Sequence, residues 1–275
     1  MRNIRLTIAY DGTDYVGWQV QPNGPSVQAA VQRAIGQLTG ETGVTVLAAG
    51  RTDSGVHALG QVANFHTNSP IPTEKFQQAL QSFLPEDVVL REAVEVAEDF
   101  HATYSAVKKR YRYAVLNAEL ADPLMRRYAW HYHGRLDVEA MHGASQALVG
   151  EHDFRCFETQ FPNRASSVRT VLEAGWGRHD AWPLWSRRAT PPAAGANDGS
   201  FLWFDIVADG FLYNMVRTIV GTLVRVGRGS WDTDDVRRII AGQDRSLAGD
   251  TAPARGLYLV AVDYEVSEGA AGFVE

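Results

Sequence analysis

One turn-like segment combines an arginine and an aspartate at a spacing that suits acid–base or nucleophilic chemistry. It reads Gly50-Arg51-Thr52-Asp53-Ser54-Gly55-Val56-His57. In an extended segment residues two apart share a face, so we expect Arg51 and Asp53 to project together, opposite Thr52. A neighbouring guanidinium lowers the pKa of a carboxyl group and keeps it ionised, as a nucleophile requires. Asp-Ser-Gly is also an ordinary turn in which Asp53 only accepts backbone hydrogen bonds, and the spacing alone favours this simpler interpretation.

A second candidate is the strand predicted over residues 107–116, which carries basic and aromatic side chains on opposite faces. Side chains alternate along a strand, so Lys108, Arg110 and Arg112 share one face while Tyr111 lies on the other. A row of cations can follow a phosphate backbone, and a tyrosine ring can stack on an unpaired base. The same pattern also fits a half-buried strand with solvated basic residues, because tyrosine favours strands in any case.

A third candidate is Arg217, which lies within a helix predicted over residues 212–226. The apolar residues of this helix cover one wide arc, and Arg217 falls just outside its edge. A charge in this position is expected to be partly buried and to need a partner, which an aspartate across a cleft would supply. The alternative is a side chain that extends to solvent along the helix surface.

Motifs for several other chemistries are missing from the sequence. Cys156 is the single cysteine, which excludes an internal disulfide and a CxxC motif. No GxxxxGK[ST], GxGxxG or GxSxG sequence occurs. His131 and His133 share a strand face without an evident third metal ligand, and Asp232 is better placed to cap a helix than to bind Mg²⁺. We therefore expect neither a metal nor a cofactor.

The apolar periodicity predicts an α+β protein made of two similar α/β halves with antiparallel or mixed sheets. The halves are residues 1–105 and 106–267, and a flexible tail follows over residues 268–275. Residues 179–200, rich in Pro, Ala and Gly, are expected to form a long loop. Strands are predicted over 2–10, 44–49, 60–67, 87–97, 107–116, 167–176, 201–208 and 256–265, and helices over 27–39, 73–83, 137–149, 212–226 and 232–241.

The composition indicates a soluble protein of the cytoplasm. Hydrophobic residues make up 45% and charged residues 21%, and no apolar run is long enough to cross a bilayer. The first residues alternate polar and apolar types, unlike a signal peptide. A net charge of −6 argues against nonspecific nucleic-acid binding, although a local basic cluster can still dominate the field of a cleft.

Taken in order, these segments resemble the tRNA pseudouridine synthase A family over nearly the whole chain. The most specific block is GRTDSGVHA at 50–58, and FLYNMVR at 211–217 and APARGLYLV at 252–260 follow in the order expected of the family. Shorter matches are IAYDGT at 8–13, GWQ at 17–19, KRYRY at 109–113 and GEHDF at 150–154.

The resemblance implies an isomerase that converts uridine to pseudouridine at positions 38–40 in the anticodon stem-loop of tRNA. Asp53 matches the family's catalytic aspartate, Tyr111 the tyrosine that stacks on the target uracil, and Arg217 the basic residue that pairs with the aspartate. Arg51 matches the arginine proposed to hold the target nucleotide out of the helix. The resemblance also implies the pseudouridine synthase fold with a central basic catalytic cleft, a homodimer, and no cofactor or metal.

The implied reaction replaces the C1′–N1 bond of one nucleotide by a C1′–C5 bond, so the target must first be flipped out of its stem. Asp53 must be ionised to act, and we expect its pairing with Arg217 to outweigh its burial. Attack at C1′, addition at C6 and removal of the 2′ proton all remain open. Tyr111, or a water that it holds, is a candidate for the base that removes the C5 proton.

Two other functional classes remain as alternatives. The first is an RNA chaperone that has lost catalysis, against which the intact set of Asp53, Tyr111 and Arg217 argues. The second is an unrelated hydrolase that uses Asp53 with His57, four residues further along the chain.

The sequence departs from the family pattern at a few positions. Thr103 stands where the family usually has arginine, and Thr218 replaces a common asparagine. Arg155-Cys156 replaces small hydroxyl residues after the GEHDF block. These departures bear on substrate range more than on activity.

Overall fold

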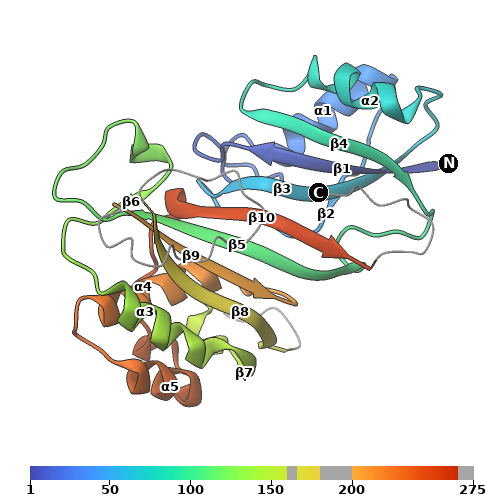
Figure 1. Ribbon diagram of the computed structural model, residues 1–275. Coiled ribbons are helices and arrows are strands. Elements are labelled where there is room, and N and C mark those ends of the chain that lie inside the picture. The colour runs from blue at the N-terminus through green and yellow to red at the C-terminus, as the bar shows by residue number, and fades with distance from the viewer. Residues whose placement is uncertain (160–165, 180–199, 266–275) are drawn as a thin grey trace.

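One mixed β-sheet organises the computed structural model, which describes residues 1–159, 166–179 and 200–265. The strand order is β4-β1-β3-β10-β5-β9-β8-β7, with β2 paired to β3 and β6 paired to β5 (Figure 1). The strands are β1 (Arg2–Tyr10), β2 (Leu47–Ala48), β3 (His57–Thr67), β4 (Val88–Val96), β5 (Ala106–Leu116), β6 (Trp130–His131), β7 (Gly150–Asp153), β8 (Val168–His179), β9 (Phe201–Ala208) and β10 (Leu257–Tyr264).

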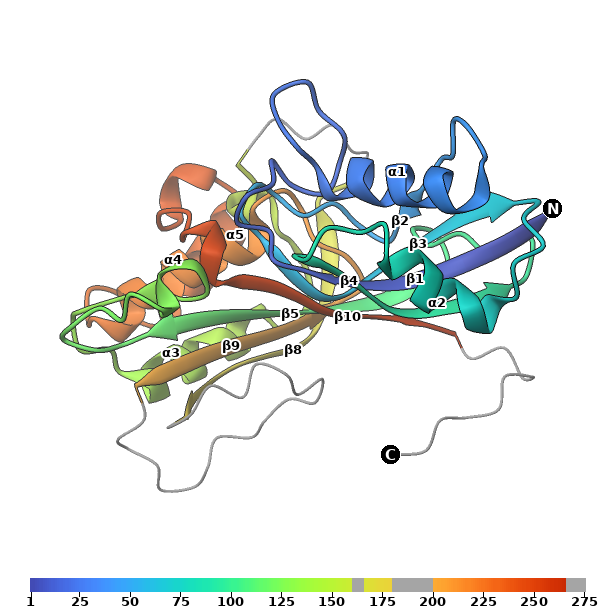
Figure 2. The same cartoon turned by 90° about the horizontal axis from the view of Figure 1, so that it is seen from above.

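Helices cover the two ends of this sheet. The helices are α1 (Val27–Thr39), α2 (Thr73–Gln81), α3 (Val138–Ser145), α4 (Met215–Gly227) and α5 (Thr233–Gly242). Figure 2 shows α1 and α2 together over the N-terminal strands, whereas α3, α4 and α5 gather at the other end, beside β7–β9 in Figure 1. The predicted α+β class is therefore confirmed, and the strands and helices of both ends contribute to one continuous apolar core.

The last strand joins the two ends of the sheet. β10 pairs with β5 in antiparallel fashion and with β3 in parallel fashion, so the C-terminal strand lies between them. The parallel contact is short and matches Tyr258 with His57 and Leu259 with Ala58. β10 therefore separates β3, which follows Asp53, from β5, which contains Tyr111, and the charge of Asp53 is close enough to act on Tyr111. The division into halves at residue 105 stays a prediction.

Local sequence signals explain where several helices begin and end. Ser26 caps α1 by accepting a hydrogen bond from the Ala29 amide at 3.3 Å, and Gly40 ends it in the left-handed region at φ 74°. Asp232 and Asp235 form a capping box at the start of α5, which confirms the predicted capping role of Asp232. None of the helices in the described ranges is long and apolar enough to span a membrane.

The predicted boundaries fail in a few places. The predicted strand over 44–49 shrinks to β2, and the helix predicted from 212 begins at Met215, because Asn214 takes a left-handed conformation. The sequence did not predict the short strand β7, and the strand expected to carry both His131 and His133 is reduced to β6, which ends at His131. The expected tail over 268–275 and most of the predicted loop over 179–200 lie outside the described residues.

Candidate active site

Asp53 lies in the turn between β2 and β3, where the loop over residues 11–25 holds it. The Trp18 amide donates to the Thr52 carbonyl at 3.1 Å, and Gly17 forms a β-bridge with Asp53. Gly17 has a φ of 112°, and a Cβ at this position would lie 2.5 Å from the Thr52 oxygen. Glycine is therefore required where the loop meets the turn.

The side chains around this turn alternate as the sequence predicts. Thr52 is buried, and its hydroxyl lies 2.8 Å from the Tyr10 hydroxyl. Arg51 is exposed, and Asp53 is partly exposed. Arg51 makes no ion pair with Asp53 within the described part of the chain, so it is not the guanidinium that acts on this carboxylate.

Arg217 is the charge partner of Asp53. Its Nη1 lies 3.5 Å from Asp53 Oδ2, and the two side chains are only 17% and 22% exposed. The guanidinium is anchored, because Nε donates to the Ala252 carbonyl at 2.7 Å and the same Nη1 donates to Asn214 Oδ1 at 2.7 Å. The partly buried arginine with an aspartate partner, predicted from the helix pattern, is present in the structure.

The pKa of Asp53 responds to two opposing influences. Burial raises it by making the charged form costly, while the charge and the hydrogen bond of Arg217 lower it. The net direction is upward from the ordinary value. The expectation that the ion pair outweighs burial is therefore wrong: the environment makes this carboxylate more basic than an exposed aspartate.

Tyr111 completes the site from β5. Its side chain is 7% exposed, and its ring lies perpendicular to that of Phe211 at 4.9 Å between centroids. Burial first, and then the nearby Tyr10 and Asp53, raise its pKa well above the usual value of a tyrosine. A phenol in this state stays protonated near neutral pH, which argues against Tyr111 itself as the base for the C5 proton.

The basic face predicted on β5 is present but neutralised. Arg112 is buried, makes two hydrogen bonds of 2.6 and 2.7 Å with Asp205, and stacks over Trp203 at 4.6 Å. Arg110 pairs with Glu173 at 2.9 Å, and Lys108 approaches Asp263 at 3.7 Å. Each of these three cations therefore has an acidic partner in the described structure. The partners belong to strands β8, β9 and β10, which are distant in sequence, and contact of this face with phosphate stays a prediction.

His57 belongs to a separate polar network. Its Nδ1 accepts from the Gly12 amide at 3.1 Å and lies 3.1 Å from Asp11 Oδ1, while Nε2 lies 3.0 Å from the Arg127 carbonyl. The ring stacks on Tyr258 at 4.8 Å. The described contacts of both ring nitrogens are with these groups and not with Asp53, so the structure gives no support to the hydrolase that would use Asp53 with His57.

The positions that depart from the family pattern have plain local roles. Thr103 donates its hydroxyl to the Ala48 carbonyl at 2.6 Å, and Thr218 is buried in α4. Arg155 pairs with Asp153 at 2.6 Å, and Cys156 is buried. No hydrogen bond or ion pair in the described structure links these side chains to Asp53 or Tyr111.

Neither of the two metal sites considered from the sequence forms. His131 Nε2 lies 2.8 Å from the Ala118 carbonyl, and Asp232 and Asp235 are used in the capping box. No group of three or more metal-binding side chains occurs among residues 1–159, 166–179 and 200–265.

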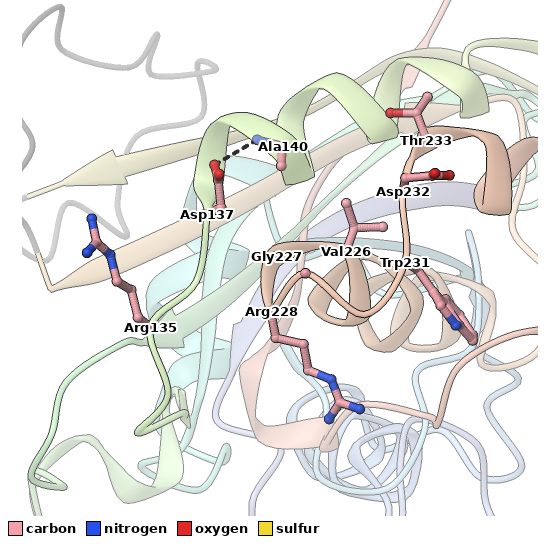
Figure 3. A pocket seen from close by; sticks show the side chains of 10 residues that line it. Arg135, Asp137, Ala140, Val226, Gly227, Arg228, Trp231, Asp232 and Thr233 are labelled. Atoms are coloured by element: carbon pink, nitrogen blue, oxygen red, sulfur yellow. Dashed lines mark hydrogen bonds between the residues drawn. The ribbon is translucent and has the colours of Figure 1, made fainter.

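A surface pocket lies away from this site, at the starts of α3 and α5. Figure 3 shows Arg135, Arg228 and Trp231 at this pocket, together with Asp137, which accepts a hydrogen bond from the Ala140 amide. Its two aspartates are the caps of the adjacent helices. None of the four predicted site residues lines it.

The family model for tRNA pseudouridine synthases matches residues 6–105 and 144–265. The chain belongs to the tRNA pseudouridine synthase family. A protein named tRNA pseudouridine synthase A from Acetivibrio thermocellus is 46% identical over 264 residues, covering 96% of this chain and 100% of the relative. One of the same name from Moorella thermoacetica is 47% identical over 263 residues, covering 95% and 99%. Pseudouridine synthases are isomerases, so this chain is an enzyme of that class.

For this tRNA pseudouridine synthase, sequence reasoning missed the groups that hold Arg217. The Asn214 side chain and the Ala252 carbonyl were not singled out, although both lie in quoted motif blocks, FLYNMVR and APARGLYLV. The spacing of three between Asn214 and Arg217 is a usable signal, because residues three apart on a helix are neighbours.

Proposed function

We propose that this enzyme isomerises uridine to pseudouridine at positions 38–40 in the anticodon stem-loop of tRNA, with Asp53 as its catalytic carboxylate. The observation that carries the proposal is the placement of Asp53 3.5 Å from Arg217 and within electrostatic reach of Tyr111. These three side chains come from a turn, a helix and a strand that are distant in sequence. The curated relatives, named tRNA pseudouridine synthase A, support tRNA as the substrate.

The bond changes of the reaction suit this arrangement. The C1′–N1 bond breaks, a C1′–C5 bond forms, the C5 proton leaves and N1 gains a proton, so no redox cofactor is needed. The uracil must rotate between the two bonding steps while it stays trapped. A tyrosine ring offers a flat surface for that rotation, and stacking on an aromatic side chain contributes about 1–3 kcal/mol per base.

The roles of the charged residues follow from their exposure. Arg51 is exposed in the turn. Its guanidinium is available to contact the phosphates of a flipped nucleotide or to fill the gap that this nucleotide leaves in the stem. Asp53 acts in its ionised form, by attack at C1′, by addition at C6 or by removal of the 2′ proton. Arg217 stabilises that ionised form against the cost of burial.

The remaining properties proposed here rest on the resemblance of the motifs to the family. We propose that the enzyme works in the cytoplasm as a homodimer and uses no cofactor. Sedimentation of the purified protein measures the oligomeric state, and dialysis against a chelator followed by an assay measures any dependence on metal.

The decisive experiment is Asp53→Asn, with pseudouridine mapped in a tRNA that has uridines at positions 38–40. We expect turnover to fall by on the order of 1000-fold or more, because the amide can neither attack nor accept a proton, with tRNA affinity changed only a few fold. Asp250→Asn is the matched control, since Asp250 is 91% exposed and pairs with Arg225. Pseudouridine formation by Asp53→Asn at the wild-type rate would refute the assignment.

A further inference from the structure

Next to the proposed catalytic pair lies a residue with an unusual backbone. Asn214 has a φ of 58°, and Gln243 at 51° is the other non-glycine residue with positive φ in the described ranges. We infer that Asn214 is a positioning residue that holds the Arg217 guanidinium in place to face Asp53. This inference rests on the proposed function of Asp53 and Arg217.

The ordinary explanation for an asparagine at this position does not apply. Asn214 occupies the N-cap position of α4, where asparagine normally has an extended backbone and its side chain accepts a hydrogen bond from the first turn. Here the backbone is left-handed and the side chain makes no capping hydrogen bond. The left-handed backbone itself favours asparagine, but the start of the helix makes no use of the side-chain amide.

The oxygen and the nitrogen of the Asn214 side-chain amide each form a hydrogen bond with another side chain instead. Oδ1 accepts from Arg217 Nη1 at 2.7 Å, and Nδ2 donates to Thr159 Oγ1 at 2.6 Å. The same Nη1 lies at the longer distance of 3.5 Å from Asp53 Oδ2. The orientation of the guanidinium is thus set mainly by Asn214 and by the Ala252 carbonyl, which accepts from Nε at 2.7 Å.

This geometry makes the acidity of Asp53 depend on Asn214. Arg217 lowers the pKa of Asp53, and that effect requires the guanidinium to remain close to the carboxylate. Without the Oδ1 acceptor, Nη1 loses its shortest hydrogen bond and the side chain gains rotational freedom. The pKa of Asp53 then rises further, and the carboxylate is ionised over a narrower range of pH.

Asn214→Gly separates the role of the side-chain amide from that of the left-handed backbone, because glycine adopts positive φ readily and lacks the amide. We expect kcat on the acid limb of the pH profile to fall about tenfold, as for loss of a hydrogen bond to a charged group. KM for tRNA should stay within twofold, and the acid limb of the pH profile should move to higher pH.

Two further variants complete the test. Gln243→Gly is the control for the backbone, because it places glycine at the other left-handed position, at the end of α5 and outside the site. It should leave kcat and the pH profile unchanged. Thr159→Val removes the acceptor of Asn214 Nδ2 and should shift the acid limb in the same direction by a smaller amount. It serves as the decisive variant if Asn214→Gly does not fold.

Wild-type kcat and pH profile in a folded Asn214→Gly protein would overturn the inference. So would a loss of kcat with an unmoved acid limb, or a change confined to KM. Asp53→Asn is assayed in parallel to separate the two claims. Activity in that variant would overturn the role of Asp53 itself, whereas an inactive Asp53→Asn beside a wild-type-like Asn214→Gly would overturn only the role of Asn214.

Discussion

At the scale of single residues, the environment of Asp53 balances reactivity against ionisation. Burial raises its pKa, which makes the carboxylate a better base and nucleophile once it is ionised. The same burial reduces the fraction that is ionised at a given pH. Arg217 opposes this effect at 3.5 Å and extends the pH range over which the carboxylate can act. The main effect of the Asp53–Arg217 pair is therefore on the pKa of Asp53 rather than on the stability of the fold.

Replacing Arg217 by methionine should shift the pH dependence of catalysis. Activity needs ionised Asp53, so the rate falls as the pH drops through the pKa of that group. Without the guanidinium the pKa of Asp53 rises, so the acid limb should move to higher pH. We expect a shift of roughly one pH unit, which is the lower end of the usual effect of a close opposite charge on a pKa. A single-turnover pH–rate profile measures the shift.

Arg225→Met is the matched control, because it removes an arginine of the same helix that pairs with Asp250 instead. Its acid limb should match that of the wild type. An unmoved limb in Arg217→Met at reduced rate would mean that Arg217 contacts the substrate rather than tuning Asp53.

Residue patterns predicted some of this site and missed the rest for physical reasons. The helical periodicity showed that Arg217 would be partly buried, because 100° per residue fixes its place relative to the apolar arc. The sign of the Asp53 pKa shift was missed, since burial depends on segments such as the loop over 11–25. The acidic partners of Lys108, Arg110 and Arg112 were missed because strand register between distant segments is not encoded locally.

At the scale of elements, Arg217 is held in place jointly by α4 and by the segment over residues 249–252. The Ala252 amide donates to the Arg217 carbonyl at 3.1 Å, and the Ala252 carbonyl accepts from the Arg217 side chain. The two segments approach closely because Gly221 has no side chain. A Cβ on Gly221 would lie 1.7 Å from the Asp250 carbonyl oxygen.

Gly221→Ala should therefore impair catalysis and stability together. The clash pushes the segment over 249–252 away from α4 and displaces the carbonyl that anchors Arg217. We expect a loss of roughly 1–3 kcal/mol in unfolding free energy, typical of overpacking, with a reduced kcat. Urea unfolding and single-turnover assays measure both effects.

Gly143→Ala provides the comparison within α3, where an added Cβ meets no heavy atom within 4 Å. It should stabilise the protein by about 0.5–1 kcal/mol, because alanine favours a helix over glycine. Equal stabilisation by the two substitutions would contradict the close approach of the two segments.

Element boundaries were predictable where one face of the element is apolar throughout. The strand over 201–208 matches β9 in full, because both its edges are paired and most of its residues are apolar and buried. The helix predicted from residue 212 was too long, since Leu212 continues the apolar pattern while the backbone turns at Asn214. β7 was missed because four residues carry too little periodicity to be recognised.

At the scale of the whole molecule, the chain carries a net charge of −6 while its proposed substrate is a polyanion. Affinity must then depend on where unpaired cations lie. The three basic residues on one face of β5 each have an acidic partner, which limits their value for phosphate contacts. Arg51 is exposed beside the catalytic turn, and the described structure gives it no ion pair.

Arg51→Gln and Lys108→Gln each remove one positive charge, yet they should differ in tRNA binding. When a protein binds RNA, each cation that contacts a phosphate releases about one counterion. Arg51→Gln should therefore reduce the magnitude of the slope of log K against log salt by about one. Lys108→Gln should keep the wild-type slope, because Lys108 already faces Asp263 at 3.7 Å. Binding of an anticodon stem-loop titrated at several salt concentrations measures both slopes. If Lys108→Gln lowers the slope and Arg51→Gln does not, the RNA follows the face of β5 rather than the catalytic turn.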